Sequence, residues 1–170
     1  MAINVYGDGN LYYHGKCCVF ISHQQKDKTA AKLIANYLLY CGIDVYFDEY
    51  DRSINRSNPQ SVVDAIKAGL QKSTHLMCLL SENSMSSKWI PWEVGYGYEY
   101  NVFCVKLKEV AFSLLPEYLQ VVPVYDGYEA LDVAIRNMRL KSNINEGQLR
   151  TFSNYNHPLS SIMYDNTFIR

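Results

Sequence analysis

The stretch SENSMSSKWIPWEVGYG, residues 81 to 97, places a single carboxylate among aromatic side chains. Pro91 suits the first turn of a helix, which leaves Trp89 in the preceding loop and puts Glu93 near the third helical position. One interpretation is that Glu93 only complements the positive end of this helix, which is worth about 0.3–1 kcal/mol. The other is that an ionised acid beside an indole serves a substrate that is cationic or becomes so.

A lone acid suits one particular kind of bond cleavage. Cleavage of an ordinary glycosidic bond takes two carboxyl groups, one of which protonates the departing oxygen. The nicotinamide of NAD+ is already a cationic leaving group and departs neutral, so no proton donor is needed. What remains is to orient the ribose and to stabilise the oxocarbenium ion that develops on it, and a fixed anion does both. Glu93 is compatible with this chemistry, although the residues alone do not identify it.

Other patterns that could carry chemistry are weaker. The segment GYGYEY (95–100) has Tyr100 where a dinucleotide-binding fingerprint has its third glycine, so packing of a helix is the preferred role for its glycines. No Walker loop, HExxH or GxSxG motif occurs. The four histidines lack metal-ligand spacing, and the acids from Asp48 to Asp51 are interpreted as a solvated loop. We therefore predict no metal site.

Length and composition indicate one ordinary globular domain: 170 residues, 48% hydrophobic and 19% charged. The net charge of −1 gives no electrostatic case for nucleic acid or an anionic membrane as partner. No apolar segment approaches the roughly 20 residues that span a bilayer, and MAINVYGDGN lacks the features of a signal peptide. Five cysteines without a CxxC pair are expected to be free core thiols. We predict a cytoplasmic protein.

Apolar strands alternate with amphipathic helices along residues 16–138. The expected strands are 16–22, 43–49, 74–81, 101–107 and 119–125. The expected helices are 26–42 ending at Gly42, 59–73 with Asn58 as its N-cap, one that contains Glu93, and 126–138. This order predicts an α/β fold, a flavodoxin-like doubly wound domain with a five-stranded parallel sheet in the order 2-1-3-4-5 and helices on both faces.

The ends of the chain fit this pattern less well. Residues 1–15 are expected to form a hairpin turning at Asp8-Gly9, or a loose N-terminal arm. Residues 139–170 form a C-terminal extension that stays unassigned. In such a fold ligands bind beyond the carboxyl ends of the strands, where the strand order reverses. That edge would be lined by Ser22 and His23, by residues 81–93, and by Asp48 with Glu49 alongside.

Several segments occur in an order that resembles a TIR domain of the bacterial type, over about residues 16–138. They are VFISHQQKD, DVYFDE with the polar loop after it, VVDAIKAGLQKSTHLMCLLSENSMSSKW, and WIPWE. The resemblance implies the flavodoxin-like fold proposed above. In members with enzyme activity it also implies cleavage of NAD+ to nicotinamide and ADP-ribose, or cyclisation to ADP-ribose isomers.

The resemblance also implies roles for individual residues. Glu93 would be the catalytic glutamate and Trp89 the aromatic that precedes it and packs on a ring of the substrate. Ser22 and His23 would face the nucleotide, Asp48 would begin the loop that gates the site and takes part in assembly, and Ser84 would contact the ligand. NAD+ is then the substrate, and no cofactor is expected. The loop DEYDRSINRSNPQ lacks the Pro-Gly pair common in animal signalling members, so their partner rules do not transfer.

Three hypotheses follow. The leading one is an NAD+ glycohydrolase or cyclase of antiphage defence, whose nucleotide product activates a separate effector protein and whose pocket is completed by self-association through TIR surfaces. Whether hydrolysis or cyclisation follows depends on the exclusion of water and stays open. The alternative is a non-enzymatic interaction module, in which Glu93 only begins a helix. The third is an enzyme resembling nucleoside deoxyribosyltransferases, which would act on deoxynucleosides and ignore NAD+.

Overall fold

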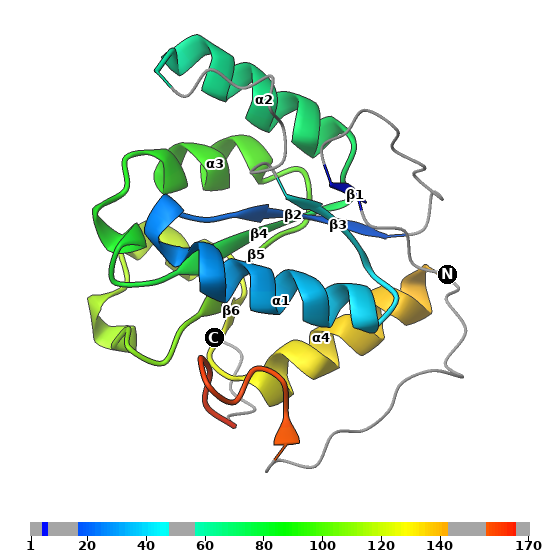
Figure 1. The fold of residues 1–170 in the computed structure, drawn as a ribbon. Coiled ribbons are helices and arrows are strands. Elements are labelled where there is room, and N and C mark those ends of the chain that lie inside the picture. The colour runs from blue at the N-terminus through cyan, green and yellow to red at the C-terminus, as the bar shows by residue number, and fades with distance from the viewer. Residues whose placement is uncertain (1–4, 7–16, 48–56, 143–155, 166–170) are drawn as a thin grey trace.

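One parallel sheet organises the chain (Figure 1). The computed structural model describes residues 5–6, 17–47, 57–142 and 156–165, and the elements below lie in these ranges. Its six strands, in the spatial order β1-β3-β2-β4-β5-β6, are all parallel to their neighbours. They are β1 (Val5–Tyr6), β2 (Cys18–Ser22), β3 (Asp44–Phe47), β4 (His75–Leu80), β5 (Val102–Lys106) and β6 (Val124–Tyr125).

Four helices cover the two faces of the sheet. Helices α1 (Lys28–Tyr40) and α4 (Tyr128–Lys141) pack on one face, and α2 (Pro59–Gln71) and α3 (Trp89–Gly97) pack on the other (Figure 1). Alternate residues of the strands from β2 to β6 serve the two layers, as in β2, where Val19 and Ile21 face α1 and α4 while Cys18 and Phe20 face α2 and α3. The prediction of a doubly wound α/β fold in the order 2-1-3-4-5 is confirmed, with β1 added at the edge.

Short 3-10 turns join several of these elements. They are η1 (Gln25–Asp27), η3 (Ser84–Ser86), η4 (Phe112–Leu114) and η5 (Glu117–Val121). Strand β1 pairs in parallel with β3. The predicted turn at Asp8-Gly9 lies outside the described residues.

Local signals set several element boundaries correctly. Gly42 has a φ of 78° just after α1, in the left-handed region that favours glycine, and its N–H donates to Leu39 O over 2.9 Å. Asn58 caps α2, because its side chain accepts a hydrogen bond of 3.0 Å from the N–H of Gln60. Both helices therefore begin or end where the sequence predicts.

The strand predicted over residues 119–125 is wrong in its first part. Residues Glu117–Val121 form the turn η5, and only Val124 and Tyr125 enter the sheet. Pro123 has no N–H to donate to a ladder, so the strand does not extend towards the N-terminus, although the carbonyl of Pro123 still accepts from Cys104 N over 2.8 Å. The last helix also runs further than predicted, to Lys141.

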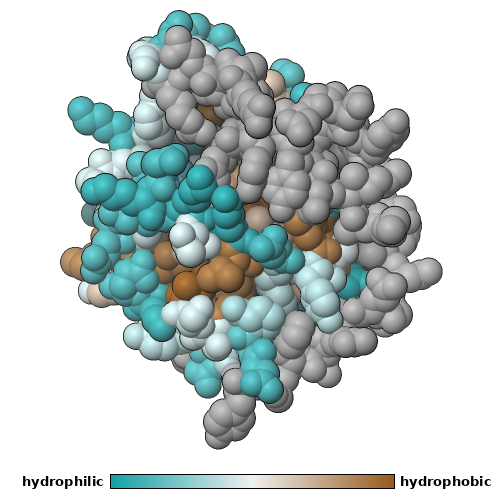
Figure 2. Space-filling view, in the orientation of Figure 1, coloured by the Kyte–Doolittle hydropathy of each residue, from teal (hydrophilic) through white to brown (hydrophobic). Residues whose placement is uncertain are grey.

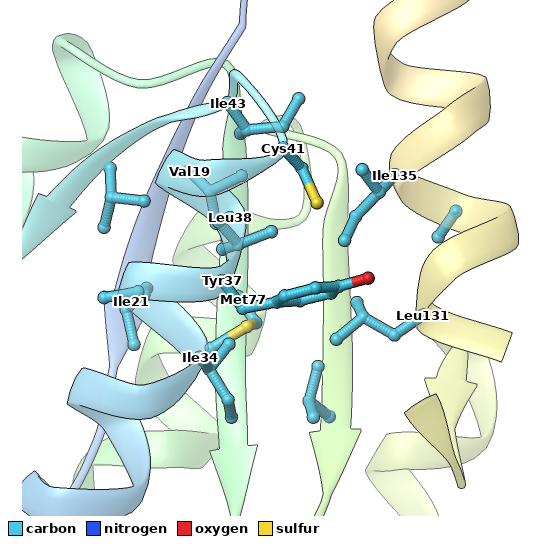
Figure 3. Packing of buried hydrophobic residues seen from close by; sticks show 14 of the residues in the cluster. Val19, Ile21, Ile34, Tyr37, Leu38, Cys41, Ile43, Met77, Leu131 and Ile135 are labelled. Atoms are coloured by element: carbon cyan, nitrogen blue, oxygen red, sulfur yellow. The ribbon is translucent and has the colours of Figure 1, made fainter. Parts of the chain in front are cut away.

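The layer beneath α1 and α4 is the larger apolar core. Figure 3 shows Ile34, Leu38, Leu131 and Ile135 directed from the two helices onto the strands, with the hydroxyl of Tyr37 pointing towards α4. Residues far along the chain complete this core, since Leu159 and Met163 are 0% and 2% exposed. On the side of the molecule seen in Figure 2, hydrophobic residues show near the centre beside hydrophilic ones. Among the described residues, no helix is both long and apolar enough to cross a membrane.

Candidate active site

A serine and a glutamate from distant parts of the chain meet at the carboxyl edge of the sheet. Ser22 is the last residue of β2 and Glu93 lies in α3, and the Ser22 hydroxyl donates a hydrogen bond to Glu93 Oε2. Both side chains are buried, each 6% exposed. Strands β2 and β4 are neighbours at the centre of the sheet, where the strand order reverses. The structure thus brings Glu93 to the edge at which doubly wound sheets bind ligands.

The helix that carries Glu93 begins earlier than predicted. Trp89 is the first helical residue and not part of the loop, and Glu93 is the fifth. Lys88 occupies the N-cap position without a side-chain bond, and Ser87 before it supplies the capping side chain: its Oγ accepts from the N–H of Trp89 over 3.1 Å and of Ile90 over 3.4 Å. Because the helix dipole acts mainly on the first turn, complementing the helix end explains the burial of Glu93 less well than its bond to Ser22 does.

Trp89 begins a row of aromatic rings along α3. It lies one helical turn before Glu93, on the same side of the helix, and is 36% exposed. Its ring packs edge-on against Trp92, with 6.2 Å between ring centroids. Trp92 in turn stacks on Tyr96 at 5.2 Å, and Tyr96 on Tyr100 at 6.5 Å. The row holds the indole of Trp89 at the surface, one helical turn before the buried acid.

The glycines of α3 have different roles. A Cβ on Gly97 would lie 2.4 Å from Cδ2 of the buried Leu76, so Gly97 lets the helix approach β4 closely. A Cβ on Gly95 would meet nothing within 4 Å. Helix packing is therefore confirmed as the role of Gly97 and not of Gly95.

His23 follows Ser22, and its ring is held by stacking on another ring. Its ring stacks on Phe47 with 4.5 Å between centroids and 16° between planes, and its Nδ1 lies 3.4 Å from Ile21 O. The half-buried ring thus stands at the carboxyl edge of β2 and β3. Asp48, which follows Phe47, lies outside the described residues, so its role at the site stays a prediction.

Ser84 lies inside the loop between β4 and α3. Its hydroxyl donates to Ser81 O over 2.9 Å and accepts from Ser81 N over 2.8 Å. The side chain is 1% exposed. Ser84 therefore builds the turn after β4, and its contact with a ligand stays a prediction.

Five residues join the two loops at this edge: Ser81, Asn83 and Ser87 lie within the predicted range 81–93, whereas sequence analysis did not single out Gln24 or Asp27. Gln24 Nε2 donates to Ser87 Oγ over 2.8 Å. Asp27 accepts from the Ser81 hydroxyl and, over 2.6 Å, from Asn83 Nδ2. The position of Ser87 just before the helix could have predicted its capping role. The hydrogen bonds of Asp27 join residues more than 50 positions apart, which no local pattern reveals.

Two buried ionisable side chains among the described residues near this edge are neutral or paired within the protein. Cys78 of β4 is fully buried, and its pKa is well above the usual range because of its hydrogen bond with Cys104, its burial and the nearby charge of Glu93. Lys106 at the end of β5 is buried too, and its ammonium donates to Leu107 O, Val110 O and Asp126 Oδ1 at 3.2, 2.7 and 2.8 Å. Its three N–H donors are therefore used within the protein. The described residues contain no group of three or more side chains suited to a metal ion.

The fold and this edge together define a class of protein. It is a doubly wound α/β domain in which β2, through Ser22, orients a glutamate of α3, the helix that follows the neighbouring strand β4. The model of the TIR domain family matches residues 19–135, and the chain belongs to this family.

Two further similarities are narrower. The probable 3' cyclic ADP-D-ribose synthase ThsB' of Bacillus cereus (strain MSX-D12) is 32% identical over 80 residues, which are 46% of this chain and 42% of that protein. The match thus spans less than half the length of either protein. A crystal structure of a conserved protein from Enterococcus faecalis V583 shares 16% identity with a TM-score of 0.46, covering 82% of this chain and 83% of the other. A score of this size adds nothing to the assignment of the fold.

Proposed function

We propose that this chain cleaves the nicotinamide–ribose bond of NAD+, with Glu93 as the catalytic residue. It would release ADP-ribose or a cyclic ADP-ribose isomer as a signal in bacterial antiphage defence. The single observation that carries the proposal is the buried Glu93 carboxylate, oriented by Ser22 at the switch point of the sheet. Membership of the TIR family and the likeness to a probable cyclic ADP-D-ribose synthase support the choice of substrate.

The geometry suits stabilisation of a developing cation. The hydrogen bond from Ser22 restricts the rotation of the Glu93 carboxylate, so the acid needs little rearrangement as positive charge grows on the ribose. Burial strengthens that interaction, because a charge pair attracts more strongly away from bulk water. The exposed indole of Trp89 offers a face for the nicotinamide or adenine ring. His23, which stacks on Phe47 beside Ser22, would face the nucleotide.

The wider role follows from the same proposal. The product would activate a separate effector protein in the cytoplasm. Self-association through TIR surfaces would complete the pocket, with Asp48 in the loop that gates it. Ser84 would contact the ligand from the loop that it builds.

The test is product analysis by mass spectrometry with purified protein and NAD+, under conditions that promote assembly and with a phage trigger added or omitted. Glu93→Gln keeps the shape of the side chain and removes its charge, so turnover should fall by about 100-fold or more, with an unaltered melting temperature. Glu99→Gln is the matched control, because Glu99 is exposed just beyond the end of the same helix, and it should turn over normally.

The other hypotheses give different results. Unchanged NAD+ under every condition, together with retained binding to another TIR domain, would make the chain an interaction module. Turnover of deoxynucleosides but not of NAD+ would make it a deoxyribosyltransferase-like enzyme. Equal loss of turnover in Glu93→Gln and Glu99→Gln would remove Glu93 from the mechanism.

A further inference from the structure

Asp27 is a buried acid for which the proposed reaction has no direct use. It is 7% exposed at the start of α1. An acid at a helix start commonly accepts from the N–H groups of its own helix, but Asp27 makes no such side-chain cap. Burying a carboxylate is costly unless hydrogen bonds compensate it. The partners of Asp27 therefore show what its burial achieves.

Those partners lie on the connection between β4 and α3. Asp27 Oδ2 accepts from the Ser81 hydroxyl, and Oδ1 accepts from Asn83 Nδ2 over 2.6 Å. Hydrogen bonds to an ionised acceptor are the stronger kind, worth about 1.5–3 kcal/mol in mutational series. Asp27 thus fixes the first residues after β4 to the start of α1.

The anchored residues carry the turn that leads to α3. Ser81 Oγ also accepts from Ser84 N over 3.0 Å, while Ser84 Oγ closes the turn from the other side. Three residues further, Ser87 caps α3 and accepts from Gln24 over 2.8 Å. The course of the chain from β4 into α3 is therefore fixed at two points.

Several side-chain hydrogen bonds across this edge come from one short segment, Ser22 to Asp27. Ser22 bonds to Glu93, Gln24 to the cap of α3, and Asp27 to the turn after β4. A shift of the connection would move α3, and with it the Glu93 carboxylate, relative to Ser22. Small displacements of a reacting group matter, since about 1 Å costs up to about 100-fold in rate.

We propose that Asp27 is a positioning residue: its carboxylate holds residues 81–88 in place and so sets Glu93 against Ser22. The inference rests on the proposed cleavage of NAD+ for its consequence in catalysis. Its structural part, that Asp27 sets the position of α3, does not depend on any activity.

The two parts are tested with one set of variants. Asp27→Ala removes both acceptors, and Asp27→Asn keeps one of them, so the second variant remains informative if the first does not fold. Asp132→Asn is the control, because Asp132 is an acid of α4 on the opposite face, where it bonds to Tyr37 over 2.6 Å. The Asp132→Asn substitution should lower the free energy of unfolding without changing the geometry around Glu93.

The first readout is kinetic, measured well below the melting temperature of each variant. Asp27→Ala should lower kcat by about 10- to 100-fold while KM changes little. The reason is that a displaced Glu93 stabilises the transition state less, whereas binding of the ground state is hardly affected. Asp27→Asn should fall between wild type and Asp27→Ala. Asp132→Asn should keep the wild-type kcat. A normal kcat in folded Asp27→Ala, or an equal loss in Asp132→Asn, would overturn the catalytic part.

The second readout needs no substrate. The chain has two tryptophans, and both lie in α3, so tryptophan emission, excited selectively over that of the tyrosines, reports on this helix. Asp27→Ala and Asp27→Asn should shift the emission while far-ultraviolet circular dichroism stays native, and Asp132→Asn should not. If wild-type protein leaves NAD+ intact, the proposed function fails and the emission still decides whether Asp27 positions α3. Unchanged emission in both folded Asp27 variants would overturn the inference.

Discussion

Two carboxylates on opposite faces of the sheet each accept a hydrogen bond from a hydroxyl group. Glu93 in α3 accepts from Ser22, and Asp132 in α4 accepts from Tyr37 over 2.6 Å. Asp132 also lies 3.4 Å from Nε2 of His157, so its group has the residue types of an acid–base site. The types alone would not separate the two groups.

The surroundings do separate them. His157 is 4% exposed, its ring stacks on Tyr128 at 4.1 Å, and its Nδ1 accepts from Leu159 N over 3.1 Å. Each ring nitrogen thus has a partner within the fold. Tyr37, Asp132 and His157, called here the α1/α4 group, connect residues 156–165 to α1 and α4. Glu93 instead meets Ser22 at the carboxyl edge, next to an exposed indole. Place in the fold, more than residue type, marks a candidate site.

The strongest test of this contrast is His157→Ala. Loss of the stacked ring and its hydrogen bonds should lower the free energy of unfolding by about 2–4 kcal/mol, measured by urea denaturation. Turnover of NAD+ per folded molecule should not change. A large loss of turnover with unaltered stability would mean that the α1/α4 group, too, is functional.

A matched pair of hydroxyl deletions tests the two acids directly. Ser22→Ala should lower kcat by about 10-fold, equivalent to about 1.4 kcal/mol, because Glu93 loses its orienting donor. Tyr37→Phe should leave kcat unchanged and cost about 1–2 kcal/mol of stability, since Asp132 loses a hydrogen bond. Kinetics and thermal melting of both variants provide the comparison, and the same pattern in both would abolish the distinction.

The two glycines of α3 provide a smaller effect. Gly97→Ala should destabilise the protein by about 1 kcal/mol, because the methyl group overpacks against Leu76 by more than the better helix propensity returns. Gly95→Ala should stabilise it by up to about 1 kcal/mol, since the site is open and only propensity changes. Melting temperatures that move the same way for both would contradict the close approach of α3 to β4.

Buried thiols in the two layers predict a modest dependence on pH. Burial raises the pKa of Cys18, in the α2/α3 layer, to about 12 and that of Cys41, in the α1/α4 layer, to about 11, from an ordinary 9.0. Between pH 9 and these values the unfolded chain loses protons that the fold retains, so stability is full below pH 9 and falls above it. Urea denaturation at pH 8 and pH 10 should show a difference of about 1 kcal/mol per thiol. Cys18→Ala should reduce that difference; an unchanged one would rule out its contribution.

Local patterns predicted most of the fold, because they depend on neighbouring residues. Periodicity placed the strands and helices, and Gly42 and Asn58 act where such residues usually act. The start of α3 was misplaced because Pro91 suggested a first helical position, whereas the hydrogen bonds make Ser87 the capping side chain. The short β6 likewise depends on one missing N–H, that of Pro123.

The site was predicted only in part, for a different physical reason. Glu93 and Ser22 could be proposed together, since strand order brings their elements to one edge. The bonds of Asp27 to Ser81 and Asn83, and of Tyr37 to Asp132, join residues 54, 56 and 95 apart. Which acid becomes buried against which hydroxyl depends on packing that no window of sequence contains.

The C-terminal residues that cover α1 and α4 bear on how this protein can be shortened. The family match ends at residue 135, yet Leu159 and Met163 lie in the main core and Tyr164 O accepts from Tyr128 N over 2.9 Å. A recombinant chain trimmed to the boundaries of the match would expose apolar surface of the main core and would leave Asp132 without its partner His157. Such a truncation should aggregate, and its inactivity would then say nothing about enzymology.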